Sequence, residues 1–255
     1  MPISNDIYYH LYEGTDERKK PPVVLIHGAG GTHLYWPFQM RRLPGYRVYA
    51  PDLPGHGRSG GSGLQTIRAY ADTVLTWMDA INLPEAAFIG HSMGSSIVLS
   101  LALTYPERIL GLGLIGSGVR LQVAPELIEA TASPTTFYSA VETLAALSFA
   151  PQTDLALTQV ATQRMAETRQ SVLHSDLLAS NEFDPGELVS SIQKPTLILV
   201  GEEDRITPVR LATFLKNAVM GSQLIVIPEA GHMVLIEQPQ AVADACRTFL
   251  SQIPY

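Results

Sequence analysis

The chain alternates short, continuously apolar runs with segments whose apolar residues recur at helical spacing. Continuous apolar runs are typical of strands that are buried on both faces of a sheet. They predict strands at 23–26, 46–50 (where Arg47 interrupts the apolar residues), 86–89, 110–115, 195–200 and 224–227. The tyrosine-rich segment 7–12 predicts an antiparallel edge strand, and the charged segment 15–20 predicts a turn.

Segments whose apolar residues recur at helical spacing follow most of these runs. Residues 67–81 carry an apolar stripe that predicts a helix packed on a sheet, and similar patterns predict a short helix at 36–43 and helices at 96–103, 209–219 and 242–253. Strand–helix alternation implies parallel strands joined by right-handed crossovers. The fold class is therefore α/β, with a mostly parallel central sheet flanked by helices.

The alternation stops in one long stretch, residues 119–192. It is rich in Ala, Leu, Thr, Ser and Gln and has no strand-like run, while helical stripes cover 139–149 and 153–169. We interpret it as a helical insertion, so that residues 1–118 and 193–255 form one core domain.

Composition narrows the possible partners. There are 17 Lys and Arg against 24 Asp and Glu, which gives a formal net charge of −7. This balance disfavours nucleic acid and anionic membrane surfaces as partners. The first residues lack a basic segment followed by an apolar run, and no apolar stretch is long enough for a membrane span. We expect a cytoplasmic protein; its oligomeric state is left open.

One cysteine excludes an internal disulfide or a cysteine-cluster metal site. Cys246 falls on the apolar face of the last predicted helix and reads as a core thiol. No His, Asp and Glu cluster has metal-ligand spacing, and no glycine-rich turn continues into Gly-Lys-Ser or Gly-Lys-Thr. We therefore expect no metal and no cofactor.

The segment Gly90-His91-Ser92-Met93-Gly94 lies between a predicted strand and a predicted helix. A sharp strand-to-helix turn would lift the Ser92 hydroxyl clear of the backbone, and glycine on both sides removes the Cβ atoms that would clash. The turn would also place the serine at a helix N-terminus, which favours an oxyanion.

Two further polar residues follow strand ends, Asp204 and His232. Ligands of open α/β sheets bind outside the carboxyl ends of the strands. Acyl transfer needs a nucleophile, a base that takes its proton, and an acid that orients the base. Ser92, His232 and Asp204 supply these three groups, in the chain order associated with this architecture.

Five motifs in order give the chain a specific resemblance to the α/β-hydrolase fold superfamily, in its lidded serine esterase and lipase-like branch. They are His27-Gly28-Ala29-Gly30-Gly31, the loop 51–59 (Pro-Asp-Leu-Pro-Gly-His-Gly-Arg-Ser), the serine turn at 90–94, the segment 201–208, and Gly231-His232. Together they span nearly the whole chain outside the insertion.

The resemblance implies roles for these residues. Ser92 would be the nucleophile, Asp204 the acid and His232 the base, and the backbone amides of Ala29 and Met93 would form the oxyanion hole. The insertion 119–192 corresponds to the lid of the family. The candidate substrate-binding residues are Gly28 and Gly30 of the first turn and, as apolar liners, Trp36, Phe137, Tyr138, Leu144, Leu147 and Phe149.

Other assignments are weaker. Some relatives place the acid after the preceding strand, but here that position reads Gly116-Ser117-Gly118, with no carboxylate. Glu202 and Glu203 remain alternative acids. We expect Asp52 to anchor its own loop and His27 and His56 to fix loops, and we expect His91 to line a buried side of the serine turn. Ser95 stands where many relatives have glycine, which predicts a modest packing change.

A serine nucleophile points to attack on a carbonyl carbon, and a small, uncharged or weakly charged carboxylic ester is the broadest fit. In the insertion, acidic residues outnumber basic ones, which suits a polyanion such as coenzyme A poorly. A thioester, an enol-lactone or the C–C bond of aromatic catabolism remains an alternative. So does a slow hydrolase whose role is to sense a ligand.

Overall fold

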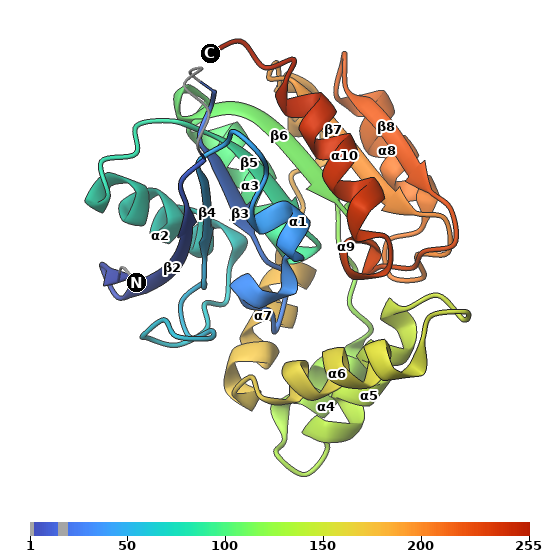
Figure 1. Cartoon of the computed structure of the whole chain (residues 1–255). Helices are drawn as coiled ribbons and strands as arrows, with labels where there is room; N and C mark the ends of the chain where they lie inside the picture. Colours follow the sequence, from blue (N-terminus) through green and yellow to red (C-terminus); the bar gives the residue numbers. More distant parts are fainter. Residues whose placement is uncertain (1–2, 15–19) are drawn as a thin grey trace.

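A central sheet of eight strands organises the computed structural model, which describes residues 3–14 and 20–255 (Figure 1). The strands lie in the order β1-β2-β4-β3-β5-β6-β7-β8. Their bounds are β1 (Ile3–Ser4), β2 (Ile7–Tyr12), β3 (Val23–Ile26), β4 (Val48–Pro51), β5 (Ala86–His91), β6 (Ile109–Ile115), β7 (Thr196–Gly201) and β8 (Gln223–Ile227).

The six apolar runs all form parallel strands, β3 to β8. Every residue of β3, β4, β5 and β7 is buried, as expected of strands covered on both faces. The antiparallel pairing expected for 7–12 is confirmed, since β2 runs antiparallel to β4. It is not the outermost strand, however, because the short β1 pairs with its other side. The turn expected at 15–20 lies outside the described residues, except for residue 20.

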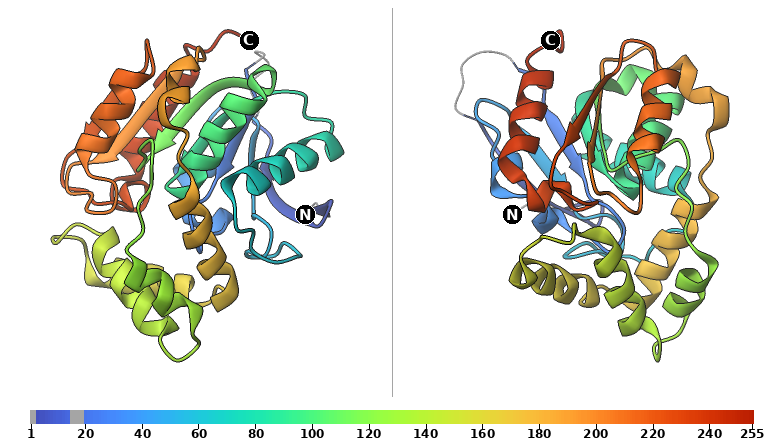
Figure 2. Two further views of the ribbon diagram at one scale, coloured as in Figure 1. Left: turned by 180° about the vertical axis from the view of Figure 1, so that it is seen from behind. Right: turned by 90° about the vertical axis from the view of Figure 1, so that its right-hand side faces the viewer.

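Helices cover both faces of the sheet (Figure 2). One face carries α1 (Phe38–Arg41) and α10 (Pro239–Leu250), while α2 (Ile67–Ala80), α3 (Met93–Thr104) and α8 (Val209–Ala218) cover the other. Short turns η1 (His33–Tyr35) and η2 (Pro106–Arg108) and the helix α9 (Val234–Glu237) complete this part. These layers confirm the predicted α/β class.

Between β6 and β7 the chain forms a group of helices at the lower edge of the sheet in Figure 1. Residues 119–192 are all described, and they contain helices and no strand. The helices are α4 (Pro125–Ala132), α5 (Phe137–Ser148), α6 (Leu155–Ala166), α7 (Gln170–Glu182) and the 3-10 turn η3 (Gly186–Ser191). We refer to residues 119–192 as the insert. Its helix α7 packs against α2 and α3 of the core.

No helix in the part of the chain that the structure describes combines the length and the apolar character that crossing a bilayer requires.

The buried thiol of Cys246 gives a test of this packing. Its side chain lies on the inner face of α10, and burial raises the pKa of the thiol to about 12. Because the thiolate is the reactive species, we expect no reaction with a thiol reagent at pH 8 while the protein is folded. One equivalent should react after unfolding in guanidinium. Rapid labelling of the folded protein would show that α10 does not pack as described.

Candidate active site

The turn between β5 and α3 places Ser92 in a backbone conformation that few residues adopt, with φ of 54° and ψ of −121°. The residues two positions before and two positions after Ser92 must be glycine for steric reasons. A Cβ at Gly94 would overlap the Ile26 carbonyl oxygen of β3, and a Cβ at Gly90 would overlap the backbone of Gly94. The turn is therefore pressed directly against the neighbouring strand, and Ser92 stands at its tip.

Ser95 does more than fill the space of a glycine. Its hydroxyl donates to the Gly90 carbonyl at 2.8 Å and accepts from the Ile115 amide at 3.1 Å. These bonds join the start of α3 to the ends of β5 and β6. The expected packing change is thus accompanied by added hydrogen bonds beneath the turn.

The predicted acid and base meet at the ends of β7 and β8. His232 Nδ1 donates to Asp204 Oδ2 at 2.9 Å, and both side chains are almost fully buried. Burial raises the pKa of Asp204, but the His232 imidazole and the hydrogen bonds to the carboxylate outweigh this effect and bring the pKa to about 2. In neutral His232 the proton on Nδ1 leaves Nε2 free to accept another.

Thr207 supports this pair through hydrogen bonds. Its role was not predicted from the sequence. Its hydroxyl donates to Asp204 Oδ2 at 2.6 Å and also lies 3.2 Å from His232 Nδ1. The amides of Ile206 and Thr207 donate to Asp204 Oδ1 at 2.9 and 2.7 Å. An aspartate whose side chain accepts from amides two and three residues later is a turn signal that the sequence does contain.

His91 lies next to the pair without sharing its chemistry. Its Nε2 donates to the His232 carbonyl at 2.9 Å, and the two rings are 4.9 Å apart. Burial and the neighbouring His232 lower the pKa of His91 to about 3. His91 is therefore a neutral ring buried beside the serine turn, and it also holds the backbone of His232.

The alternative acids face other partners. Glu203 accepts from the Gln152 side-chain amide, and Glu202 is exposed. Asp52 anchors its own loop, since it accepts from the amides of His33 and Arg58. Of the carboxylates in the described residues that we considered for this role, the one that contacts His232 is Asp204.

The loop after β3 brings the Ala29 amide to the same place. The Gly28 carbonyl accepts from His27 Nδ1 at 2.8 Å and from the Gly31 amide at 3.1 Å. In a trans peptide the N–H points away from the C=O, so these bonds fix the direction of the Ala29 amide. A Cβ at Gly28 would lie 3.1 Å from Ser92 Cβ, which shows how closely the loop approaches the serine.

His27 is held as a neutral ring in this loop. Its Nε2 accepts from the Leu53 amide at 3.0 Å, which leaves the proton on Nδ1. Burial lowers its pKa to about 4. The second predicted donor, the Met93 amide, belongs to the first residue of α3 and has no acceptor within the helix.

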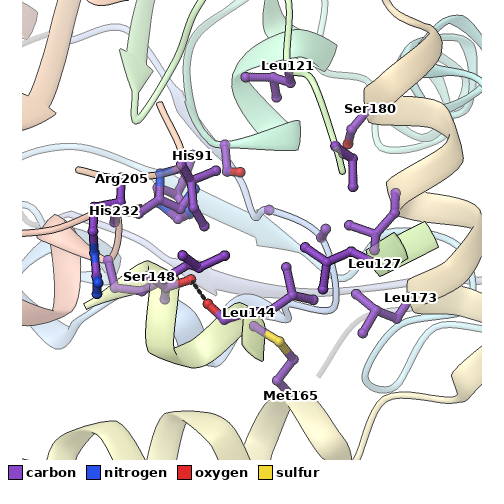
Figure 3. A pocket seen from close by; sticks show the side chains of 18 of the residues that line it. His91, Leu121, Leu127, Leu144, Ser148, Met165, Leu173, Ser180, Arg205 and His232 are labelled. Atoms are coloured by element: carbon purple, nitrogen blue, oxygen red, sulfur yellow. Dashed lines mark hydrogen bonds between the residues drawn. The ribbon is translucent and has the colours of Figure 1, made fainter. Parts of the chain in front are cut away.

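Part of this site opens onto one pocket of about 210 Å³ (Figure 3). Ser92, His232, Gly28 and Ala29 line it from the core. Leu144, Met165 and Leu173 of the insert lie opposite His91 and His232. No hydrogen bond joins Ser92 to His232 among the described residues, although both line the pocket; such contacts are often long before substrate binds.

Several predicted pocket residues lie elsewhere. Trp36 is 1% exposed and packs in the core between the sheet and α10, whereas Tyr138 is 60% exposed on the surface of α5. Phe137 packs against the cluster of Val141, Leu173 and Leu177. None of these three residues is among those that line the pocket, because the rotation of an insert helix depends on its packing partners and because Trp36 packs against the sheet and α10.

Some of the other predicted pocket residues line the pocket and some do not. Leu144 and Leu147 do line the pocket, while Phe149 is buried beside Tyr35 and Met233. Gly30 is not a lining residue: its amide is bonded to Asp176 of α7, which the sequence reading did not single out. Within residues 3–14 and 20–255, no group of three or more His, Cys, Asp and Glu side chains is placed to hold a metal ion.

Comparison with known proteins places this geometry in a family. Residues 21–239 match the family described as the alpha/beta hydrolase fold. A pimeloyl-[acyl-carrier protein] methyl ester esterase of Neisseria meningitidis serogroup C is 29% identical over 255 residues, covering 93% of this chain and 98% of the relative. A 2-hydroxymuconate semialdehyde hydrolase of Pseudomonas putida is 29% identical over 262 residues, covering 93% and 89%.

A solved structure supports the same placement. A thermophilic esterase from Thermogutta terrifontis superposes with a TM-score of 0.86 at 26% identity, covering 97% of this chain and 93% of the other. The matched range includes the serine turn, the loop after β3 and the Asp204–His232 pair. The chain therefore belongs to the alpha/beta hydrolase fold family and is a hydrolase of the esterase type.

Proposed function

We propose that the chain cleaves small, uncharged or weakly charged carboxylic esters through an acyl-enzyme at Ser92. The observation that carries the proposal is the 2.9 Å hydrogen bond from His232 to a buried Asp204, beside a pocket that Ser92 also lines. In this assignment Ser92 is the nucleophile, His232 the base and Asp204 the acid that orients the base.

The reaction follows from these positions. His232 Nε2 takes the hydroxyl proton while Ser92 Oγ attacks the ester carbonyl carbon, and the amides of Ala29 and Met93 stabilise the resulting oxyanion. The oxyanion collapses, the C–O bond breaks, and His232 returns the proton to the leaving alcohol. Water, activated by the same ring, then releases the carboxylic acid and regenerates Ser92.

The insert is proposed to act as the lid of this site. Leu127 of α4, Leu144 of α5 and Met165 of α6 all contribute to the pocket wall. Because α4, α5 and α6 lie over the carboxyl ends of the strands, they would exclude water and shape the acyl and alcohol positions.

The pocket wall favours a neutral substrate. It is mostly aliphatic, and the Arg205 guanidinium that reaches it already donates to the backbone carbonyls of Ala146 and Phe149. The Neisseria relative is named for a methyl ester, which supports a small alcohol as the leaving group. The carbon–carbon hydrolase among the relatives makes a C–C bond substrate the second candidate. That candidate is weaker because C–C hydrolases often have Asn before the nucleophile, where this chain has His91.

Replacement of the acid tests the assignment directly. Asp204→Asn is expected to fold but to lower kcat by roughly 10³- to 10⁴-fold, because the base loses its orienting partner and the wrong tautomer is favoured. Glu202→Gln, an exposed neighbour with the same change in charge, is the matched control and should retain activity. Steady-state kinetics on a p-nitrophenyl ester decides this. Near-normal turnover by Asp204→Asn would place the acid elsewhere.

Covalent labelling tests the nucleophile. An organophosphate is expected to add once per chain, at Ser92, and to abolish turnover, since the activated hydroxyl attacks phosphorus as it attacks a carbonyl. Ser92→Ala should lose the adduct and hydrolysis, apart from roughly 10³-fold residual catalysis over water. The variant Ser62→Ala, at an exposed serine, should behave as the wild type. Peptide mass spectrometry locates the adduct, and an adduct on another residue contradicts the mechanism.

Chain-length preference tests the substrate class. Because the pocket of about 210 Å³ is smaller than the roughly 300–1,000 Å³ of sites for drug-sized ligands, turnover should be highest for acyl chains of about two to six carbons. Leu144→Ala should enlarge the pocket and shift the optimum to longer chains. Rates on a graded series of p-nitrophenyl esters measure both effects. An unchanged optimum in Leu144→Ala would show that this wall does not bind the acyl chain.

A further inference from the structure

A carboxylate of the insert, Asp176 on α7, is completely buried against the core. Its Oδ2 accepts from the Gly30 amide and from His56 Nε2, both at 2.8 Å. Its Oδ1 accepts from the Tyr70 hydroxyl at 2.5 Å. One side chain of the insert thus joins three separate segments of the core: the loop after β3, the loop after β4, and α2.

The Asp176–His56 contact is an ion pair. His56 Nδ1 lies 3.0 Å from the Pro54 carbonyl, which can only accept, and Nε2 lies on the Asp176 carboxylate. Both ring nitrogens therefore donate, and the ring is an imidazolium. Burial lowers the pKa of His56, but the attraction of Asp176 outweighs it and raises the pKa overall. Burying two charges costs free energy that their attraction only partly returns, so general stability does not account for this pair.

The insert also binds the other backbone group of Gly30. Thr168, in the turn before α7, donates its hydroxyl to the Gly30 carbonyl at 2.9 Å. Gly30 has a φ of +62°, and Met165 and Leu173 pack where a side chain would stand. The N–H and the C=O of this residue are therefore both held by side chains that do not belong to the core.

Gly30 follows the proposed oxyanion donor directly. The Gly30 N–H belongs to the same peptide plane as the Ala29 carbonyl, so the bond to Asp176 fixes the rotation on the C-terminal side of Ala29. His27 and the Gly31 amide fix the plane on its N-terminal side, which contains the Ala29 N–H. Without Asp176, one of the two planes that meet at Ala29 would lose its restraint.

We propose that Asp176 and Thr168 are positioning residues, by which the insert holds the loop after β3 in the shape that aims the Ala29 amide at the oxyanion. Neither residue touches the reacting atoms. This inference rests on the proposed function, since it assigns the purpose of the contact to a charge that develops at the ester carbonyl. It predicts an effect on kcat with little effect on substrate affinity.

The principal test is Asp176→Asn, with Glu182→Gln as the control because Glu182 is exposed on the same helix and undergoes the same change in charge. Two readouts are needed: amide hydrogen exchange at Gly30, and kcat and KM on a p-nitrophenyl ester. We expect faster Gly30 exchange and a kcat lowered roughly 10- to 100-fold, less than the roughly 10²- to 10³-fold loss of a whole oxyanion donor. KM should change less than about twofold, because the donor acts in the transition state.

A second pair of variants covers the case in which Asp176→Asn fails to fold. Thr168 is only half-buried, so Thr168→Val should fold while losing the bond to the Gly30 carbonyl. Thr168→Ser retains the hydroxyl and should restore both the slow exchange at Gly31, whose amide lies in that peptide plane, and the wild-type kcat. A general loss of structure in Thr168→Val would change kcat and KM together, whereas the positioning role predicts a loss of kcat with KM retained.

The outcomes separate this inference from the proposed function. Unchanged Gly30 exchange in Asp176→Asn, or faster exchange with normal kcat, would overturn the positioning role. Equal loss of kcat in Glu182→Gln would overturn it as well. If the wild type does not hydrolyse esters but Gly30 exchange still responds to Asp176→Asn, the proposed function fails while the contact between the insert and the loop is supported.

Discussion

The constraint on which the site depends is the contact between the backbone of the serine turn and the backbone of β3. A Cβ at Gly94 would overlap the Ile26 carbonyl oxygen, so the turn can approach the strand this closely only with glycine there. That approach forces Ser92 to a φ of 54° and leaves its side chain at the tip of the turn. It also sets Gly28, which follows the same strand, against Ser92 Cβ. Ser92 and the loop after β3 are therefore brought together by one steric contact.

Hydrogen bonds from buried polar side chains then hold the parts of the backbone that this steric contact does not fix. His27 and His91 each occupy a site in which one ring nitrogen donates to a backbone carbonyl, and burial keeps both rings neutral. His56 occupies a site with two acceptors and is held charged. The number of acceptors around each ring thus decides its protonation state. Neutral rings support the backbone next to Ser92 and His232. The charged ring lies against the insert, with its centroid 4.8 Å from that of His27.

How much of this could be predicted from the sequence depended on the range of the interactions. The strands at 23–26 and 110–115 were predictable because continuous apolar runs require burial on both faces, and Asp204 and His232 because polar residues follow strand ends. The pocket wall was predictable only in part: Leu144 and Leu147 line it, whereas Trp36 and Tyr138 do not. The side of a helix or loop that faces a cavity is decided by packing partners far away in sequence. Asp176 was missed for the same reason: its partner Gly30 is 146 residues away.

The insert is hydrogen-bonded to the rest of the chain at two separate places. At one end, the Ser148 carbonyl of α5 accepts from the Met233 amide at 2.9 Å, and Arg205 donates to carbonyls at the end of α5. At the other end, α7 and the turn before it hold Gly30. The insert is therefore bonded to the residues that adjoin His232 and Asp204 as well as to the residue that follows Ala29. A displacement of the whole insert would break contacts on both sides of the pocket. The helices that line the pocket and the loops that carry its polar groups are consequently joined by hydrogen bonds on both sides of the pocket.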